Sequence, residues 1–255
     1  MIIVCSALVV VIAVGAITFS LSPSATQQSG NATGKKLPMK DILSAITQPR
    51  VISLATRSDR RDVFQDGPAQ RWALKPRFVM GIALPRHPEL GCLRSHLEAL
   101  SAGIHAGEDP IVVMEDDFET RVDVDHLRRR VQEINDETRG KWRGILLARV
   151  LHSGKHTSGQ VVKVGKAKTT AGYMVRTSEA QRLHRYLTKL EARVVAGKEP
   201  LRLRAMDDHW NGIVGRGRWY TTLQPLGGQR PGYSDITRRN EDYTEYEKGV
   251  KGALN

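Results

Sequence analysis

The chain has 255 residues, which is enough for one domain with a substantial core and short appendages. Its 40% hydrophobic and 26% charged residues are those of an ordinary globular protein. Aromatic residues make up only 5% of the chain, which argues against a binding surface built from stacked rings. Two cysteines, Cys5 in an apolar N-terminal run and Cys92 deep in the domain, exclude a disulfide framework.

The net charge of +12 is compatible with nucleic acid, an anionic membrane surface or an anionic substrate as partner. A nucleic-acid-binding protein would gather basic residues on one face with interleaved aromatics, and the sequence shows neither feature. Its one conspicuous basic run, residues 128–130, falls in an amphipathic helical pattern, where a solvated face explains it. We therefore expect no nucleic-acid partner.

Residues 2–21 carry no charge and consist mainly of Val, Ile, Ala and Leu. About 20 apolar residues are enough to cross a bilayer as a helix, so we interpret residues 1–21 as a signal anchor that makes the membrane a partner. A cleaved signal peptide is the alternative, because the Ser-Pro-Ser-Ala of residues 22–25 offers a small-residue cleavage site.

Residues 22–48 are rich in Ser, Thr, Gln and Gly and are interpreted as a flexible stem. The positive-inside rule would place Lys35 and Lys36 in the cytoplasm, but both are distant from the apolar run and a large domain follows them. We expect a lumenal domain of the endoplasmic reticulum or Golgi in a eukaryote, and a secreted or inner-membrane-associated protein otherwise. Asn31 begins a glycosylation sequon that is meaningful only in a lumenal stem.

From residue 49 to residue 240, apolar runs alternate with helical patterns, which predicts a single α/β domain followed by a polar tail at 241–255. The polarity after Arg238 predicts loose order there. Strands are predicted at residues 50–54, 77–82, 111–114 and 144–148, of which the third is the clearest. Helices with one apolar stripe, each covering a sheet, are predicted around residues 93–104, 127–134 and 183–190.

Three acidic residues, Glu115, Asp116 and Asp117, follow directly on the predicted strand at 111–114. Ligands of open α/β sheets bind at the carboxyl ends of strands. Adjacent carboxylates repel one another unless a cation neutralises them, and Mg²⁺ or Mn²⁺ commonly takes one or two carboxylates plus substrate phosphates. The triplet therefore predicts a metal–diphosphate site, with a solvated turn at a strand end as the alternative.

Four sequence blocks surround this triplet in order. They are Val-Ile-Ser-Leu at 51–54 with Asp-Arg-Arg at 59–61; Gly-Cys-Leu-Arg-Ser-His-Leu at 91–97; Val-Met-Glu-Asp-Asp at 113–117; and, more weakly, Gly-Tyr-Met-Val at 172–175, Met-Asp-Asp-His at 206–209, Gln229 and Ser-Asp at 234–235. Over residues 50–236 this pattern resembles glycosyltransferase family 25, which includes bacterial lipooligosaccharide galactosyltransferases and animal procollagen galactosyltransferases. The sequence departs from the family pattern at two places: Ser53 stands where the family usually has Asn, and Ala55-Thr56 begins the Arg-rich turn. These differences affect the expected contacts to the nucleotide and not the expected fold.

The resemblance implies a GT-A type fold, that is, an α/β nucleotide-sugar-binding domain. It implies a UDP-sugar donor, most often UDP-galactose, a divalent cation, usually Mn²⁺ with Mg²⁺ as the alternative, and inversion at the anomeric carbon for a β linkage. The acceptor would be a hydroxyl of a glycan or a protein. An inactive family member acting as a binding module and a metal-dependent phosphohydrolase are the alternative functions, although the eight histidines show no metal-ligand spacing.

By this resemblance, Glu115 and Asp117 occupy the outer positions of an Asp-x-Asp-like motif, with Asp117 as the direct metal ligand. Asp207 or Asp208 would be the base that takes the proton of the acceptor hydroxyl, while the other caps the helix that begins near His209. The sequence does not choose between the two aspartates.

Seven positions are expected to contact the donor, namely Ser53, Arg57, Ser95, His96, Glu115, Asp116 and Gly172. Ser95 and His96 lie near a predicted helix N-terminus, which favours anions, although a packing histidine is an equal alternative. Arg57 meets the nucleotide or faces solvent. Gly172 is expected to permit a close backbone approach, with strand packing as the alternative.

Overall fold

The computed structural model describes residues 36–198 and 205–248, all within one compact unit. The predicted signal anchor, the sequon at Asn31 and residues 249–255 of the tail lie outside the described residues. Within the described ranges, no helix combines the length and the apolar character needed to cross a membrane.

Eight strands form one central sheet, in the order β2-β1-β3-β8-β5-β9-β7-β6, and two small two-stranded sheets stand beside it. The strands are β1 (Arg50–Leu54), β2 (Arg77–Gly81), β3 (Ile111–Glu115), β4 (Phe118–Thr120), β5 (Gly144–Leu146), β6 (Val150–Ser158), β7 (Val161–Lys168), β8 (Gly172–Val175), β9 (Trp219–Thr222), β10 (Gly227–Gln229), β11 (Gly232–Ser234) and β12 (Arg239–Glu241). The α/β class expected from the sequence is confirmed.

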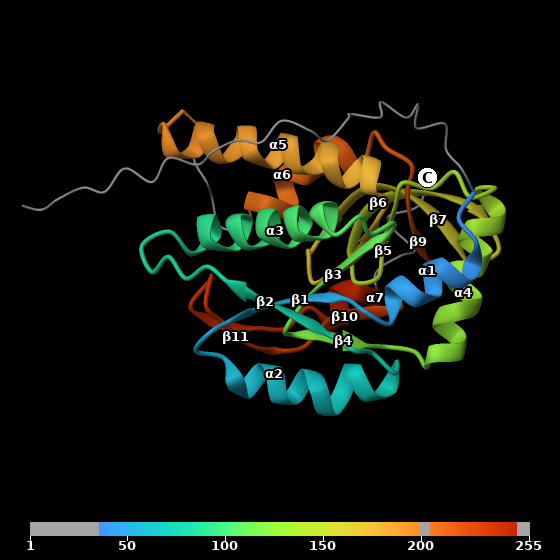
Figure 1. Ribbon diagram of the computed structural model, residues 1–255, viewed down its shortest axis with the longest axis horizontal. Helices are drawn as coiled ribbons and strands as arrows, with labels where there is room; N and C mark the ends of the chain where they lie inside the picture. Colours follow the sequence, from blue (N-terminus) through green and yellow to red (C-terminus); the bar gives the residue numbers. More distant parts are fainter. Residues whose placement is uncertain (1–35, 199–204, 249–255) are drawn as a thin grey trace, which may run out of the picture. The chain divides into compact units, whose positions relative to one another are not determined.

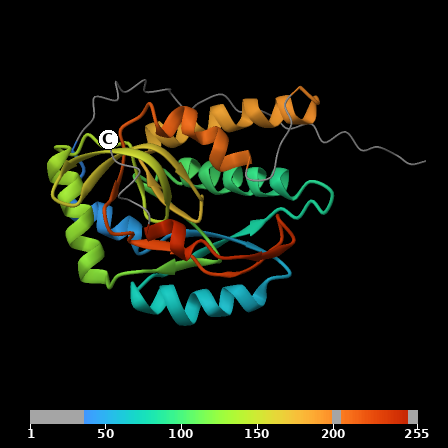
Figure 2. The same cartoon turned by 180° about the vertical axis from the view of Figure 1, so that it is seen from behind.

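Helices cover both faces of this sheet (Figures 1 and 2), with α3, α5 and α6 on one face and α2 on the other. They are α1 (Met39–Ile46), α2 (Ser58–Phe64) with its π-helical continuation η1 (Gln65–Ala69), α3 (Pro88–His105), α4 (Val124–Glu137), α5 (Thr177–Val195), α6 (Ala205–Val214) and α7 (Thr244–Lys248). All three predicted helices are present, as α3, α4 and α5.

The alternation of side chains along β3 explains why the sheet is covered on both sides. Ile111 and Val113 belong to the apolar cluster under α3 and α5, whereas Val112 and Met114 belong to the cluster that contains residues of α1, α2 and α4. All four side chains are at most 2% exposed. A strand buried on both faces must be apolar at every position, which is why β3 gave the clearest signal in the sequence.

Strand directions bring the ends of four segments to one edge of the sheet. β1 pairs in parallel with both β2 and β3, so these three strands end together. β8 is antiparallel to β3, with Gly172 opposite Met114, so the residues just before β8 lie at the same edge. Residues that follow β1, β2 and β3 therefore meet those that precede β8.

The C-terminal part differs from the expected loose tail. Residues 239–248 form β12, which pairs with β11, and α7. The sequence also gave no sign of the long β6–β7 hairpin, because β6 consists mostly of exposed polar residues and Gly154. Pairing with β7 through three irregular steps supplies the order that the polar sequence of β6 does not indicate.

Candidate functional site

A cavity of about 420 Å³ lies where β1, β2 and β3 end. One part of its lining is apolar and includes Ile82, Leu84 and Pro85, whereas another part carries arginines and the acidic triplet. A volume of this size is typical of sites for small molecules and cofactors. Its mixed lining suits a ligand with an apolar end and an anionic end.

The two carboxylate oxygens of Asp117 have different surroundings. Oδ2 accepts a hydrogen bond from Gln229 Nε2 at 3.1 Å and another from Arg60 Nη1 at 3.3 Å. Oδ1 is buried and has no hydrogen-bond partner among the described residues. Burial and the nearby Glu115 carboxylate raise the pKa of Asp117 to about 7, although Arg60 acts in the opposite direction. A cation at Oδ1 would satisfy this oxygen and favour the carboxylate form.

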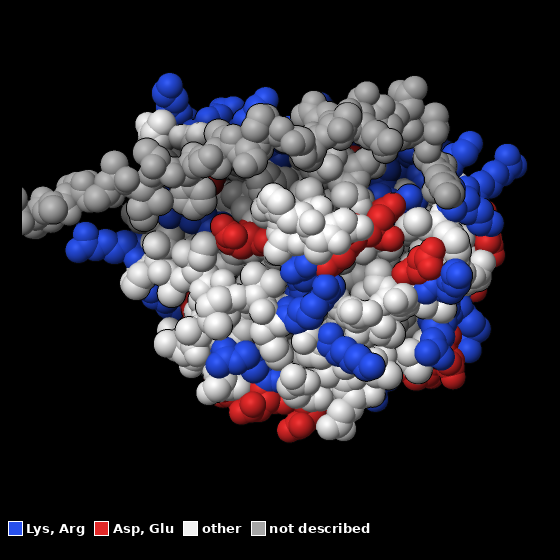
Figure 3. Space-filling model, in the orientation of Figure 1, with Lys and Arg blue, Asp and Glu red and all other residues white. Residues whose placement is uncertain are grey.

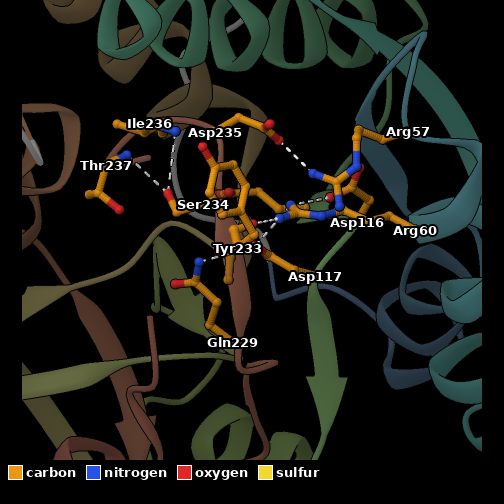
Figure 4. Close-up of polar contacts among 12 residues, drawn as sticks. Arg57, Arg60, Asp116, Asp117, Gln229, Tyr233, Ser234, Asp235, Ile236 and Thr237 are labelled. Carbon is orange, nitrogen blue, oxygen red and sulfur yellow. Dashed lines mark hydrogen bonds and ion pairs between the residues drawn. The ribbon is translucent and has the colours of Figure 1, made fainter. Parts of the chain in front are cut away.

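Arg60 connects the acidic triplet with the C-terminal segment (Figure 4). Its Nη1 atom lies 3.1 Å from Asp116 Oδ1 and 3.3 Å from Asp117 Oδ2, while Nη2 donates to the carbonyl oxygen of Tyr233. Its side chain is only 14% exposed. The guanidinium therefore holds the segment from Gln229 to Arg238, which we name the strap, against the acidic triplet, and residues of this segment line the cavity.

Arg57 forms a second connection between α2 and the strap. Its Nη1 atom donates to Asp235 Oδ2 at 2.6 Å, and its Nε atom donates to Asp59 Oδ1 at 3.0 Å. On the opposite side of the strap, Arg238 donates to the carbonyl oxygen of Pro85. The strap is thus fixed to α2 and to the loop between β2 and α3.

Glu115 is held in place by the side chains of Thr170 and His96. Thr170 Oγ1 donates to Glu115 Oε1 at 2.6 Å, and His96 Nε2 lies 3.3 Å from the same oxygen. The other ring nitrogen, Nδ1, lies 3.2 Å from the hydroxyl of Tyr173, so a proton on Nε2 and a hydroxyl donor at Nδ1 satisfy both contacts. Burial alone would raise the pKa of Glu115, but the hydrogen bonds from His96 and Thr170 outweigh it and lower the pKa.

The sequence did not distinguish Asp207 from Asp208, but their side chains lie in different environments. Both lie in the first turn of α6, which begins at Ala205, so neither occupies the position before the helix. Asp207 Oδ2 accepts a hydrogen bond from the Thr169 amide at 3.0 Å, and Oδ1 is buried without a partner among the described residues. Burial raises the pKa of Asp207 to about 6. Asp208 pairs with Lys168 at 3.2 Å, and its side chain is 50% exposed.

Two other expected donor contacts, Ser95 and Ser53, have hydrogen-bond partners within the protein. Ser95 lies about two turns inside α3, which begins at Pro88, so it is not at the helix N-terminus. Its hydroxyl donates to the Gly91 carbonyl and accepts from the Ile82 amide. Ser53 is 3% exposed and accepts from Arg61.

Gly172 lies in the core and does not line the cavity. A Cβ atom at this position would lie 2.6 Å from the ring of Phe118, so strand packing accounts for the glycine. His96 is likewise fully buried and has both ring nitrogens engaged. Of the residues expected to contact the donor, six line the cavity, namely Ser53, Arg57, Ser95, His96, Glu115 and Asp116.

The donor set fits a divalent cation bound together with a diphosphate. In the described ranges, no group of three His, Cys, Asp or Glu side chains is arranged to hold a metal by itself. Mg²⁺ and Mn²⁺ do not need such a group, because one or two carboxylates and phosphate oxygens suffice. Asp117 Oδ1, with Glu115 nearby, would provide the protein ligands.

Charges on the protein surface do not form a single basic patch on the face seen in Figure 3, where Lys and Arg are interspersed with Asp and Glu.

No known protein-family profile matches the chain, and no curated protein is similar to it in sequence. Solved structures with a similar chain path include A197 from STIV, with a TM-score of 0.39, 10% identity, and coverage of 68% of this chain and 80% of that chain. A glycosyltransferase involved in the glycosylation of the major capsid of PBCV-1 has a TM-score of 0.44 and 6% identity over 68% of this chain and 80% of that chain. An apo UDP-glucose pyrophosphorylase has a TM-score of 0.42 and 9% identity over 84% of this chain and 88% of that chain.

These TM-scores and identities are low, so the resemblance to glycosyltransferase family 25 stays a prediction. The function proposed below rests on the side chains of the site.

Sequence reasoning did not assign a role to Thr170, Tyr173 or Tyr233. Thr170 and Tyr173 flank the start of β8, and the position of β8 beside β3 is not visible in a linear pattern. Tyr233 is 49% exposed and lines the cavity. In the sequence, its position directly before the Ser-Asp pair of the fourth block could have indicated that it lies at the site.

Proposed function

We propose that the chain is a glycosyltransferase of GT-A type that transfers a sugar, with galactose as the first candidate, from a UDP-sugar to a hydroxyl of a glycan or protein. The observation that carries this proposal is the buried Oδ1 atom of Asp117, which lacks a partner among the described residues inside a cavity that also contains arginines. An isolated structural carboxylate would gain nothing from such burial.

The cavity has a suitable lining for each part of a nucleotide sugar. Its apolar part, which includes Leu84 and Pro85, would hold the nucleobase, and Arg57 and Arg60 would contact the diphosphate. Bound Mn²⁺ or Mg²⁺, held by Asp117 and Glu115, would neutralise the charge that develops on the leaving diphosphate.

Asp207 is the better of the two candidate bases. In an inverting transfer the acceptor oxygen forms a bond to the anomeric carbon while the bond from that carbon to the diphosphate oxygen breaks. The proton of the acceptor hydroxyl must pass to a base on the acceptor side. Asp207 Oδ1 is free to accept it, whereas Asp208 is engaged with Lys168 and faces solvent.

The test measures UDP release and sugar transfer by the purified full-length chain with a panel of UDP-sugars and either Mn²⁺ or Mg²⁺. We expect one UDP-sugar to be used and a chelator to abolish its use. Asp117→Asn should lower the rate by more than about a hundredfold, whereas the control Asp125→Asn, at an exposed carboxylate on α4 paired with Arg128, should not.

The products separate this function from the alternatives. Release of UMP or inorganic phosphate instead of UDP would indicate a phosphohydrolase. Binding of a UDP-sugar without turnover under any metal would indicate a binding module. Failure to bind any nucleotide sugar would contradict the proposal as a whole.

We also propose that the domain lies in the lumen behind a membrane anchor formed by residues 1–21. Glycosidase-sensitive mass on Asn31 in a eukaryotic host would support a lumenal stem. Labelling of the domain from the cytoplasmic side of intact vesicles would contradict it.

A further inference from the structure

A second, smaller cavity of about 80 Å³ adjoins the first. The two share five lining residues, which are Cys92, Glu115, Gln229, Ser234 and Ile236. Only the second is lined by Asp207, the candidate base. This cavity therefore lies where an acceptor would approach the sugar of a donor bound in the first cavity.

Two buried atoms of this cavity lack hydrogen-bond partners among the described residues, namely Asp207 Oδ1 and Thr237 Oγ1. Each would form a hydrogen bond with a polar ligand that enters. The cavity is smaller than the first one, so it suits the hydroxyl-bearing end of an acceptor.

The two cavities differ in the charges that line them. Three arginines, Arg57, Arg60 and Arg238, line the first cavity beside four acidic residues, and these arginines suit an anionic diphosphate. The second is lined by Glu89, Glu115 and Asp207, and its described lining residues include no Lys or Arg. The nearby Lys168 is already paired with Asp208.

We propose that the second cavity is the acceptor subsite and that it selects an acceptor end that is uncharged or cationic. An acceptor with a phosphate, sulfate or carboxylate next to its reactive hydroxyl is excluded. Carboxylates only accept hydrogen bonds, so they pair with hydroxyl and ammonium groups and repel anions. This inference rests on the proposed function, and it runs against the net charge of +12, which alone would favour an acidic substrate.

One experiment uses Cys92 as a reporter, because its side chain lines both cavities and is a free thiol. The full-length chain is treated with the cationic aminoethyl or the anionic sulfonatoethyl methanethiosulfonate, and mass spectrometry follows the Cys92 peptide. The rate of each reagent with Cys92 is divided by its rate with a small free thiol in solution, which removes the difference in intrinsic reactivity. Because the same thiol reacts with both reagents, the ratio of the two normalised rates reports the electrostatic potential along the path to Cys92. We expect the cationic reagent to react at least about tenfold faster.

Matched variants on α3 locate the effect. Glu89→Gln should reduce the ratio, because Glu89 lines the second cavity only, whereas Glu98→Gln, at an exposed position of the same helix, should not. Equal rates, or a faster anionic reagent, would overturn the proposal.

A second experiment measures UDP release with pairs of acceptors that differ only by a carboxylate or a phosphate next to the accepting hydroxyl. Stimulation by the neutral member at least about tenfold above its anionic partner is expected, and a preference for the anionic member would overturn the inference. UDP release without acceptor reports on donor use separately. If that release is absent with every UDP-sugar, the proposed function fails, while the Cys92 ratio still decides the charge selectivity of the cavity.

Discussion

The backbone amide of Thr169 donates a hydrogen bond to Oδ2 of Asp207, while Oδ1 of the same carboxylate has no partner among the described residues. The amide fixes the orientation of the carboxylate, and Asp207 lines the second cavity with its other oxygen unpaired among the described residues. Such an arrangement suits a general base, because the group that accepts the proton is oriented before the acceptor arrives.

Replacement of this carboxylate should therefore separate the two neighbouring aspartates. Asp207→Asn is expected to lower kcat by about 10² to 10⁴-fold with little change in UDP affinity, because an amide oxygen does not accept the proton. Asp208→Asn is the matched control and should retain most of the activity, since Asp208 faces solvent beside Lys168. Equal losses in the two variants would contradict the assignment.

The pH dependence of transfer should follow the protonation of Asp207. Because burial raises the pKa of this group from 3.8 to about 6, the carboxylate form needed for catalysis is lost as the pH falls through 6. We expect kcat to be level above pH 7 and to fall about tenfold for each pH unit well below 6. The check is a kcat profile from pH 4.5 to 8 at saturating donor and metal, and a profile that is flat across this range would exclude Asp207 as the base.

The direction of the pKa change of Asp207 also predicts how the Asp207→Asn substitution affects stability, which provides a control for the activity measurement. A folded-state pKa above the unfolded value means that the folded chain binds this proton more tightly, so ionisation of Asp207 opposes folding at neutral pH. Asp207→Asn should accordingly leave Tm at pH 7 unchanged or raised. A lower Tm would show that the activity loss comes from unfolding.

His96 is expected to act as a positioning residue for Glu115. His96→Gln should raise the Mn²⁺ concentration needed for half-maximal activity by about 10- to 100-fold, which is typical when a partner of a metal ligand is lost. Thr170→Val, which removes the second hydrogen bond to Glu115 Oε1, should act in the same direction. His184→Gln is the control, because this half-buried histidine on α5 does not line the cavity. Loss of kcat with an unchanged Mn²⁺ requirement would refute the positioning role.

Gly91 allows α3 to pack against the end of β2. A Cβ atom at this position would lie 2.3 Å from the carbonyl oxygen of Ile82, and backbone there cannot move without displacing the wall of the cavity. Gly91→Ala should lower the free energy of unfolding by about 1–3 kcal/mol and weaken UDP-sugar binding. Gly67→Ala, where a Cβ meets nothing within 4 Å, is the control, with both variants compared by urea denaturation. Similar stability of the two variants would show that α3 can shift at no cost.

The parts of the fold that follow from the sequence are those with a local signal. β3 is apolar at four consecutive positions, and α3 repeats Leu93, Leu97 and Leu100 on one side, so periodicity and burial agree. The start of α3 at Pro88 instead of near Leu93 was missed, although proline is favoured in the first turn of a helix.

The remaining features depend on tertiary pairing. Gly172 looks like a backbone-approach position in the sequence, but the ring of Phe118 occupies the space beside it. The choice between Asp207 and Asp208 needed the position of α6 against Thr169, which no pattern in the sequence contains. The hydrogen bond from Thr170 to Glu115 likewise exists because β8 runs antiparallel beside β3.

Arg57 and Asp235, which fasten the strap, are 178 positions apart in the chain. A ribosome makes the chain from the N-terminus, so the acidic triplet is synthesised long before the segment that closes over it. A chain that ends before residue 229 lacks the hydrogen bond from Gln229 to Asp117. A premature stop between the acidic triplet and the strap would therefore yield a polypeptide that has these carboxylates but lacks the strap residues that line the cavity.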